Sequence, residues 1–196
     1  VVFPRGRKFR QPTRVTYPLI VKSSFEDASL GIAQASIVSN EEKLAERVAF
    51  MHHTYGTDVM AEEFIEGREV YLGLIGNSRV ETFPVWEMKF NKWPEGVPRI
   101  ATEKVKWDVR YQIARDIQTE AAELPDDVQR RIERIGRQVY KVLGLSGYAR
   151  VDLRLTEDGR VYVIEANPNP DLAHDEDFAK SARAGGLEYP ALVERI

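Results

Sequence analysis

Two carboxylates near the C-terminal end of the sequence occupy facing positions if the chain folds there as a β-hairpin. Asp158-Gly159 is a preferred two-residue turn between two stretches that alternate like strands. Counting back from that turn pairs Asp152 with Glu165. Directly opposed side chains have Cβ atoms about 4.5–5.5 Å apart, and like charges at that distance repel each other. A divalent cation would remove the repulsion, so the pair is a candidate metal site.

An amide and a guanidinium extend the same row. Asn167 would face Arg150, and strand alternation places both side chains on the face that carries the two carboxylates. Two carboxylates and an amide carbonyl are oxygen ligands that suit Mg²⁺ or Mn²⁺. Mg²⁺ keeps coordination positions for water and phosphate, which fits so few protein ligands. Arg150 would supply a fixed cation for a phosphate or a developing oxyanion.

The alternative is an ordinary surface hairpin in which Arg150 forms salt bridges with both acids. Three features favour the metal site: Asn167 at the end of the row, the rigid exit Pro168-Asn169-Pro170, and an apolar opposite face that should lie on a core. That face would consist of Val151, Leu153, Leu155, Tyr162, Ile164 and Ala166.

Strands and helices alternate along the chain that must position this hairpin. One helix is expected to begin near Asn40 and to bury Leu44, Val48 and Met51. Residues 92–112 read as a long active loop with little regular structure. This mixture with antiparallel hairpins indicates the α+β class. The other expected strands span 17–22, 32–38, 58–65, 69–75, 79–90, 147–156 and 160–167, and the other helices span about 126–143, 175–184 and 189–195.

Composition limits the functional classes. The chain has 196 residues, 43% of them hydrophobic and 30% charged, with a net charge of -3. It can bury a core as one domain or two joined lobes, and it lacks the basic excess of a general nucleic-acid binder. The sequence contains no cysteine, which excludes disulfides and thiolate metal sites and fits the cytoplasm. No apolar run approaches the ~20 residues of a membrane span, so we expect neither a nucleic-acid nor a membrane partner.

Four segments follow one another in a recognisable order. They are residues 17–22 (YPLIVK), 26–31 (EDASLG), 62–69 (EEFIEGRE) and the pair 147–152 (GYARVD) with 163–168 (VIEANP). Together they resemble the ATP-grasp superfamily, nearest to the C-terminal, ATP-binding region of its D-alanine–D-alanine ligase branch. The resemblance extends over most of the chain.

The resemblance implies the ATP-grasp fold, with two α/β lobes whose mainly antiparallel sheets hold ATP between them. Residues 1–61 would form the small lobe, and residues 62–196 would form the large lobe. The family's N-terminal substrate domain would be absent, because Val1 begins in what reads like the middle of a strand. The partners that the resemblance allows are this missing N-terminal domain and a second copy of the chain in a homodimer.

The resemblance also implies which residues bind the nucleotide. Lys22 would hold ATP phosphates, Ser29 with its neighbouring backbone would close over them, and Glu69 would bind the ribose hydroxyls. The adenine would be lined by Glu62, Glu63, Phe64 and Ile65. A further lysine of the family lies in its long loop, and the candidates for it here are Lys104, Lys106 and Arg110.

For the reacting groups, the resemblance implies that Asp152, Glu165 and Asn167 hold two Mg²⁺ ions, with Glu165 bridging. Arg150 would stabilise the reacting phosphoryl or tetrahedral species. One departure concerns Asp171, which replaces a glycine whose amide helps to bind the acceptor carboxylate in the ligase branch. This replacement puts D-alanine as the substrate in doubt.

The function expected from these residues is an ATP- and Mg²⁺-dependent carboxylate–amine ligase module. It would activate a small-molecule carboxylate as an acyl phosphate for attack by an amine. Kinase-type phosphoryl transfer to another acceptor and a non-catalytic nucleotide-binding fragment are the alternatives. The sequence contains neither a Walker A pattern nor GxGxxG, which disfavours ordinary P-loop or Rossmann binding.

Overall fold

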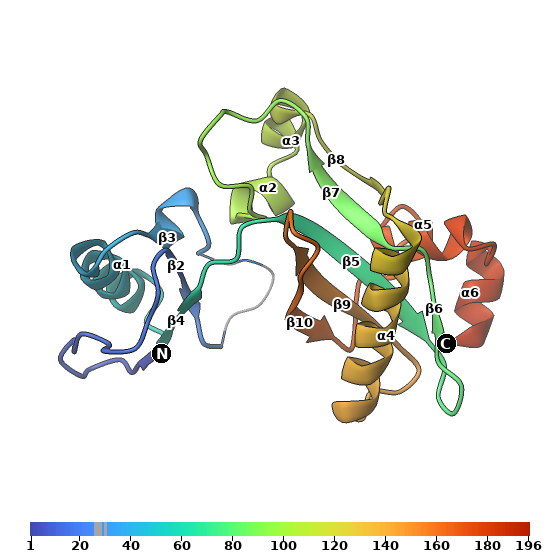
Figure 1. Ribbon diagram of the computed structural model, residues 1–196, viewed down its shortest axis with the longest axis horizontal. Coiled ribbons are helices and arrows are strands. Elements are labelled where there is room, and N and C mark those ends of the chain that lie inside the picture. Colours follow the sequence, from blue (N-terminus) through green and yellow to red (C-terminus); the bar gives the residue numbers. More distant parts are fainter. Residues whose placement is uncertain (26–28, 30) are drawn as a thin grey trace. The chain divides into compact units, whose positions relative to one another are not determined.

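The computed structural model describes residues 1–25, 29 and 31–196 (Figure 1). Its described residues form two compact units, each built from two stretches of chain. The first unit comprises Val1–Glu66 and Phe90–Ile117, and the second comprises Gly67–Lys89 and Gln118–Ile196. Residues 90–117, which the sequence assigned to the large lobe, therefore group with the N-terminal stretch.

The first unit is built on a four-stranded antiparallel sheet with the strand order β1-β4-β2-β3. Helix α1 (Glu41–Thr54) packs on it and buries Leu44, Val48 and Met51, as expected. The Asn40 side chain accepts a hydrogen bond from the backbone N–H of Lys43, which caps the start of α1. The strands are β1 (Val2–Phe3), β2 (Leu19–Ser23), β3 (Ile37–Val38) and β4 (Val59–Glu63), and a 3₁₀ turn spans Gln34–Ser36.

Two short helices lie where the sequence predicted an irregular loop. They are α2 (Glu103–Trp107) and α3 (Val109–Arg115). The Thr102 side chain caps α2, and the Asp108 side chain caps α3 by accepting from the backbone N–H of Tyr111. The prediction of little regular structure was therefore wrong here, because two strong N-cap residues start helices that are too short for an apolar stripe to reveal.

The second unit is built on a six-stranded sheet with the order β10-β9-β5-β7-β8, and β6 pairs with β5. The pairings of β5 with β6, β7 and β9 and of β9 with β10 are all antiparallel. The α+β class with antiparallel sheets is thus confirmed. The strands are β5 (Arg68–Ile75), β6 (Glu81–Thr82), β7 (Trp86–Phe90), β8 (Ile117–Ala121), β9 (Tyr148–Leu155) and β10 (Val161–Asn167).

Helix α4 (Asp126–Val142) covers one face of this sheet and contacts β5, β9 and β10 (Figure 1). Gly136 lets the helix approach closely, because a Cβ there would lie 2.2 Å from Cδ2 of Leu72. The core between helix and sheet is the largest apolar cluster of the unit. Its buried members are Val70, Leu72, Leu74, Val85, Ile132, Tyr140, Ala149, Val151, Leu153 and Leu155.

Two further helices end the chain, as the sequence predicted. They are α5 (Asp177–Ala184) and α6 (Tyr189–Arg195), and they pack against each other. Phe178 of α5 meets Phe83 edge-on, with ring centroids 5.3 Å apart, which attaches the helix pair to the sheet. Among the residues that the structure describes, no helix combines the length and the apolar character that crossing a membrane requires.

Candidate functional site

The hairpin of β9 and β10 has the register that the sequence predicted for its polar residues. Asp152 pairs with Glu165, and Arg150 pairs with Asn167. Asp152 is buried, whereas Glu165 lies on the exposed edge strand β10. The two carboxylates of the proposed metal site are therefore brought together by direct strand pairing.

The prediction of a two-residue turn at Asp158-Gly159, from which this register was counted, was wrong. The loop has three residues, 157–159, and is closed by hydrogen bonds from Thr156 N to Arg160 O (2.9 Å) and from Gly159 N to Thr156 O (3.0 Å). Gly159 takes the left-handed conformation (φ 78°) that such three-residue loops require. A bulge between Val163 and Glu165 then shifts the pairing by one residue. The bulge restores at Glu165 the register that the longer loop alone would have lost.

The three-residue loop and the bulge together change which β10 residues face the core. Val161 and Ala166 pack against the α4 cluster. Tyr162 pairs with Arg154 and so lies on the polar face, while Ile164 sits at the bulge with 44% of its surface exposed. The prediction that Tyr162 and Ile164 belong to the apolar face was therefore wrong.

Arg150 is held against Asp152 rather than left as a lone cation. Its Nε donates to Oδ1 at 2.7 Å, and its Nη2 donates to Oδ2 at 2.8 Å. Its guanidinium also lies 5.0 Å from the centre of the Tyr71 ring. Burial alone would lower the pKa of Arg150, but the Asp152 carboxylate outweighs burial and raises that pKa. The ordinary surface hairpin would also pair Arg150 with Asp152. Here, however, the pair is joined by two hydrogen bonds, and both side chains are mostly buried.

Glu69 is oriented by two residues that the sequence reasoning missed. Tyr71 Oη donates to Glu69 Oε1 (2.9 Å), and Arg154 Nη2 donates to Glu69 Oε2 (3.0 Å). Arg154 Nη1 also binds the carbonyl of Gly67 at 3.0 Å. Burial raises the pKa of the Tyr71 phenol well above its ordinary value, so it stays a donor. The available signal for Arg154 was its position two residues after Asp152, which puts it on the same strand face.

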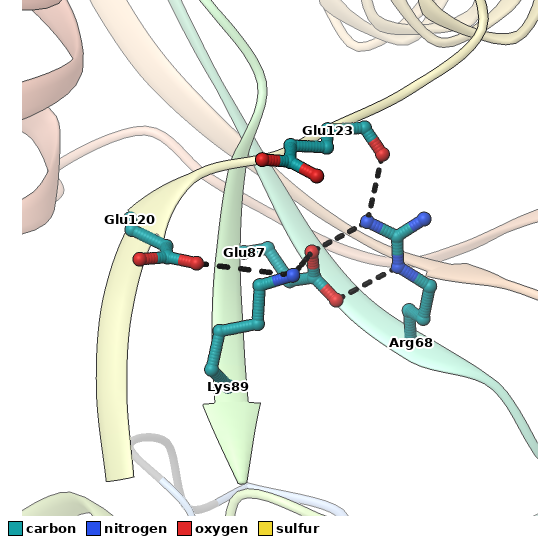
Figure 2. Close-up of polar contacts among 5 residues, drawn as sticks. All are labelled: Arg68, Glu87, Lys89, Glu120 and Glu123. Atoms are coloured by element: carbon teal, nitrogen blue, oxygen red, sulfur yellow. Dashed lines mark hydrogen bonds and ion pairs between the residues drawn. The ribbon is translucent and has the colours of Figure 1, made fainter. Parts of the chain in front are cut away.

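A second charge cluster fixes the start of β5 from the α4 side of the sheet (Figure 2). Arg68 donates to buried Glu87 from Nε (2.8 Å) and Nη2 (2.5 Å), and Lys89 lies 2.8 Å from the same carboxylate. Arg68 also donates to the carbonyl of Glu123, and Lys89 lies 3.9 Å from Glu120. Burial would raise the pKa of Glu87, but the bonds from Arg68 and Lys89 outweigh it and lower that pKa. The strand that carries Glu69 is thereby held to β7.

In the first unit, Lys22 and Glu62 form an ion pair, with Nζ and Oε2 2.5 Å apart. The side chain of Lys22 is only 22% exposed, so it is not the solvent-reaching lysine of an ordinary strand end. Glu63 is exposed, and the backbone N–H of Phe64 donates to Pro18 O. Ile65 follows the end of β4. Lys22 and Glu62, the residues expected at the phosphates and at the start of the adenine segment, thus lie on the neighbouring strands β2 and β4.

Part of the expected phosphate loop, residues 26–28 and 30, lies outside the described residues. Ser29 adopts a left-handed conformation (φ 62°). Gly31, where the loop ends, donates from its N–H to Glu103 Oε2 (3.0 Å), and its carbonyl accepts from Arg47 Nη2 (2.6 Å). Sequence reasoning missed Glu103 and Arg47. The candidate cations Lys104 and Lys106 lie on α2 beside Glu103, and Arg110 lies on α3.

The donor set of the hairpin fits a hard divalent cation. It consists of two carboxylates and the Asn167 side-chain oxygen, which also accepts a hydrogen bond from Asn169 N (2.8 Å) and is thereby oriented. No group of three or more His, Cys, Asp or Glu side chains suited to a metal occurs in residues 1–25, 29 and 31–196. The expected set has only two such side chains, because its third ligand is an amide, and water or phosphate would have to complete its coordination.

Comparisons with known proteins identify the family and the fold of this chain. A family model described as D-ala D-ala ligase C-terminus matches residues 7–196. The D-alanine--D-alanine ligase of Geotalea uraniireducens (strain Rf4) is 30% identical over 196 residues, covering 100% of this chain and 58% of that protein. The D-alanine--D-alanine ligase of Desulforudis audaxviator (strain MP104C) is 30% identical over 179 residues, covering 91% of this chain and 54% of that protein.

The solved structures show the same fold. The crystal structure of the D-alanine--D-alanine ligase of Bacillus anthracis complexed with ATP matches with a TM-score of 0.75 at 22% identity, covering 100% of this chain and 57% of that one. The chain thus spans between half and three-fifths of the length of these relatives. With its antiparallel sheets and its match to the family model over almost its whole length, the chain belongs to the D-ala D-ala ligase C-terminus family and has the ATP-grasp fold.

Proposed function

We propose that this chain is the ATP-binding part of an ATP- and Mg²⁺-dependent ligase that joins a carboxylate to an amine. The observation that carries the proposal is the direct pairing of Asp152 with Glu165, beside Arg150 and Asn167, on one face of the sheet. Two opposed carboxylates beside an amide oxygen are the kind of oxygen ligands that Mg²⁺ takes in proteins. Membership of the ligase family supplies the class of reaction.

Asp152, Glu165 and Asn167 would hold Mg²⁺, which when bound would neutralise negative charge on the ATP phosphates. Asp152 shares its carboxylate with Arg150. This sharing fixes the carboxylate before any ligand arrives, so little ordering is needed on binding. Arg150 in turn stays charged and can donate to an oxyanion at the reacting centre.

The nucleotide would be held by groups from several strands. Lys22, positioned by Glu62, would act as a point charge for phosphate, and Ser29 would contribute at the phosphate loop. Glu69, fixed by Tyr71 and Arg154, would accept hydrogen bonds from the ribose hydroxyls. The segment Glu62, Glu63, Phe64 and Ile65 would line the adenine.

The ligation would proceed in two steps, formation of an acyl phosphate and its attack by the amine. A carboxylate oxygen of the first substrate attacks the γ-phosphorus of ATP, the bond to the β–γ bridging oxygen breaks, and ADP leaves with an acyl phosphate remaining. The amine then attacks the acyl carbon, loses a proton, and inorganic phosphate leaves with the electrons of the C–O bond. The chain's own contribution is to position both partners and to stabilise charge through Arg150 and Lys22.

Asp171 bears on which amine is accepted. Its Oδ1 accepts a hydrogen bond from Ala173 N (2.8 Å), which orients a carboxylate just beyond the hairpin exit. A carboxylate at this position would repel the carboxylate of an amino-acid acceptor such as D-alanine. We therefore propose an acceptor amine without a neighbouring carboxylate.

Hydroxylamine trapping tests the proposed function. The chain is incubated with Mg-ATP, hydroxylamine and a panel of small carboxylates, and the products are assayed for hydroxamate and phosphate, with Glu165→Gln as the matched control. Hydroxamate formed by the wild type alone is the expected result. Phosphoryl transfer without hydroxamate would instead indicate a kinase, and Mg-ATP binding without any product would indicate a non-catalytic nucleotide-binding module.

A further inference from the structure

Gly31, the residue that ends the expected phosphate loop, is bound from both sides by charged side chains. Its N–H donates to Glu103 Oε2 at 3.0 Å, and its carbonyl oxygen accepts from Arg47 Nη2 at 2.6 Å. Arg47 belongs to α1 and Glu103 belongs to α2, so two helices from distant parts of the chain meet at this one residue. Hydrogen bonds to ionised groups are roughly twice as strong as those between neutral groups. The position of Gly31 is therefore fixed by two strong bonds.

Glu103 and Arg47 make further bonds to the same segment. The backbone N–H of Glu103 donates to Ile32 O at 3.0 Å, so α2 binds two consecutive residues of that segment. Arg47 Nη2 also donates at 2.9 Å to Oγ of Ser36, which is fully buried. Both charged side chains are thus held in place at Gly31 by the protein's own contacts.

The backbone conformation at Gly31 depends on such restraint. Its φ of 72° lies in the left-handed region that favours glycine, and a Cβ there would lie 3.0 Å from the ring of Tyr55. Glycine loses more conformational entropy on ordering than any other residue. The bonds from Arg47 and Glu103 order it as part of folding. Without them, that entropy would be lost when a ligand binds at the loop, and the affinity for that ligand would fall.

We propose that Glu103 and Arg47 are positioning residues for the triphosphate of the nucleotide. They act through Gly31, because holding the end of the loop also places Ser29 for its contact with phosphate. Ser29 lies two residues earlier, and its carbonyl oxygen accepts a hydrogen bond from Ile32 N at 2.9 Å. The inference rests on the proposed function and adds residues of α1 and α2 to it. Since Gly31 ends the phosphate loop and is not part of the adenine segment, the effect should fall on the phosphates and spare the nucleoside.

The test compares Glu103→Ala and Glu103→Gln with the wild type, with Glu95→Ala as the matched control. Alanine removes the acceptor for the Gly31 N–H, whereas glutamine keeps a side-chain oxygen that can accept from it. Glu95 is an exposed carboxylate of the same unit, so its removal changes the net charge by the same amount. Dissociation constants for Mg-AMP-PNP and adenosine are measured by titration calorimetry, and thermal unfolding is followed without ligand.

The expected losses differ between the two ligands. Glu103→Ala should weaken Mg-AMP-PNP binding about tenfold, and Glu103→Gln should weaken it less than about threefold. Adenosine binding should stay within about twofold of the wild type in both variants, and Glu95→Ala should bind both ligands like the wild type. Arg47→Met keeps the apolar stem of the arginine and removes the bond to the Gly31 carbonyl, so it should also weaken Mg-AMP-PNP binding about tenfold.

The direction of the change separates positioning from simple electrostatics. Removing a negative charge near a phosphate site would by Coulomb attraction alone strengthen the binding of an anion, whereas loss of positioning weakens it. Unchanged or tighter Mg-AMP-PNP binding by Glu103→Ala, an equal loss for adenosine, or an equal loss in Glu103→Gln would overturn the inference while leaving the proposed function intact. A wild type that binds no Mg-AMP-PNP would overturn the proposed function and the inference together.

Discussion

Removing the Asp152 carboxylate should destabilise the protein, whereas removing the Glu165 carboxylate should not. In Asp152→Ala, the Arg150 guanidinium loses both of its hydrogen bonds while its side chain is only 20% exposed. Breaking a buried ion pair by deleting one partner costs about 3–5 kcal/mol. The lower end, about 3 kcal/mol, applies here because Arg150 keeps some solvent contact and the nearby charge of Asp177.

The two single variants and one double variant separate this cost from the loss of function. Glu165 is exposed, so Glu165→Ala should change the free energy of unfolding by no more than about 1 kcal/mol. For a chain of this size, Asp152→Ala should lower the melting temperature by about 6–12 °C. Arg150→Met/Asp152→Ala should recover part of the loss, because no unpaired charge remains.

The assay is urea and thermal unfolding followed by circular dichroism, without nucleotide and with EDTA present. Both single variants should also lose Mg-ATP turnover. Asp152→Ala should therefore lose both stability and activity, whereas Glu165→Ala should lose activity alone. Equal stability of Asp152→Ala and the wild type would refute the reasoning, because Arg150 would then not depend on this carboxylate.

Two further predictions concern the fold around the site. Because the pKa of Glu87 is lowered by Arg68 and Lys89, its contribution to stability is present above the unfolded pKa of about 4.3 and is lost as pH falls through the folded pKa. The difference in unfolding free energy between wild type and Glu87→Gln should be about 1–3 kcal/mol at pH 7. Urea unfolding measured at a series of acid pH values should show this difference shrinking below pH 4, and a pH-independent difference would contradict the prediction. Gly136→Ala should destabilise the protein by about 1–2 kcal/mol, because the added Cβ would lie 2.2 Å from Leu72 in a filled core. The higher helix propensity of alanine offsets only part of this strain. An increased melting temperature would contradict the prediction and show that Leu72 can move aside.

The pairing of Asp152 with Glu165 could be predicted from sequence, although the turn used to predict it was wrong. The three-residue loop shifts the register by one, and the bulge before Glu165 shifts it back. Without the bulge, the longer loop would have placed Glu165 on the opposite face, so the polar row depends on the bulge. The bulge itself has no sequence signal, because Val163 and Ile164 suit a regular strand equally well.

What sequence could not provide was the set of partners from distant strands. Arg154 binds Glu69 because β5 pairs with β9, which lies about eighty residues further along the chain. Local periodicity predicts a strand but not its neighbour in the sheet. Glu103 was missed for the same reason, since its contact with Gly31 joins parts of the chain 72 residues apart.

Binding of Mn²⁺ at the hairpin is the most direct test of the central claim. Free Mn²⁺ is followed by electron paramagnetic resonance while it is titrated into the chain with AMP-PNP, for the wild type and for Glu165→Ala. The wild type should remove Mn²⁺ from solution beyond the amount that the nucleotide alone binds, and Glu165→Ala should not, although it remains folded. Identical titrations of the two proteins would mean that the cation and its nucleotide bind elsewhere.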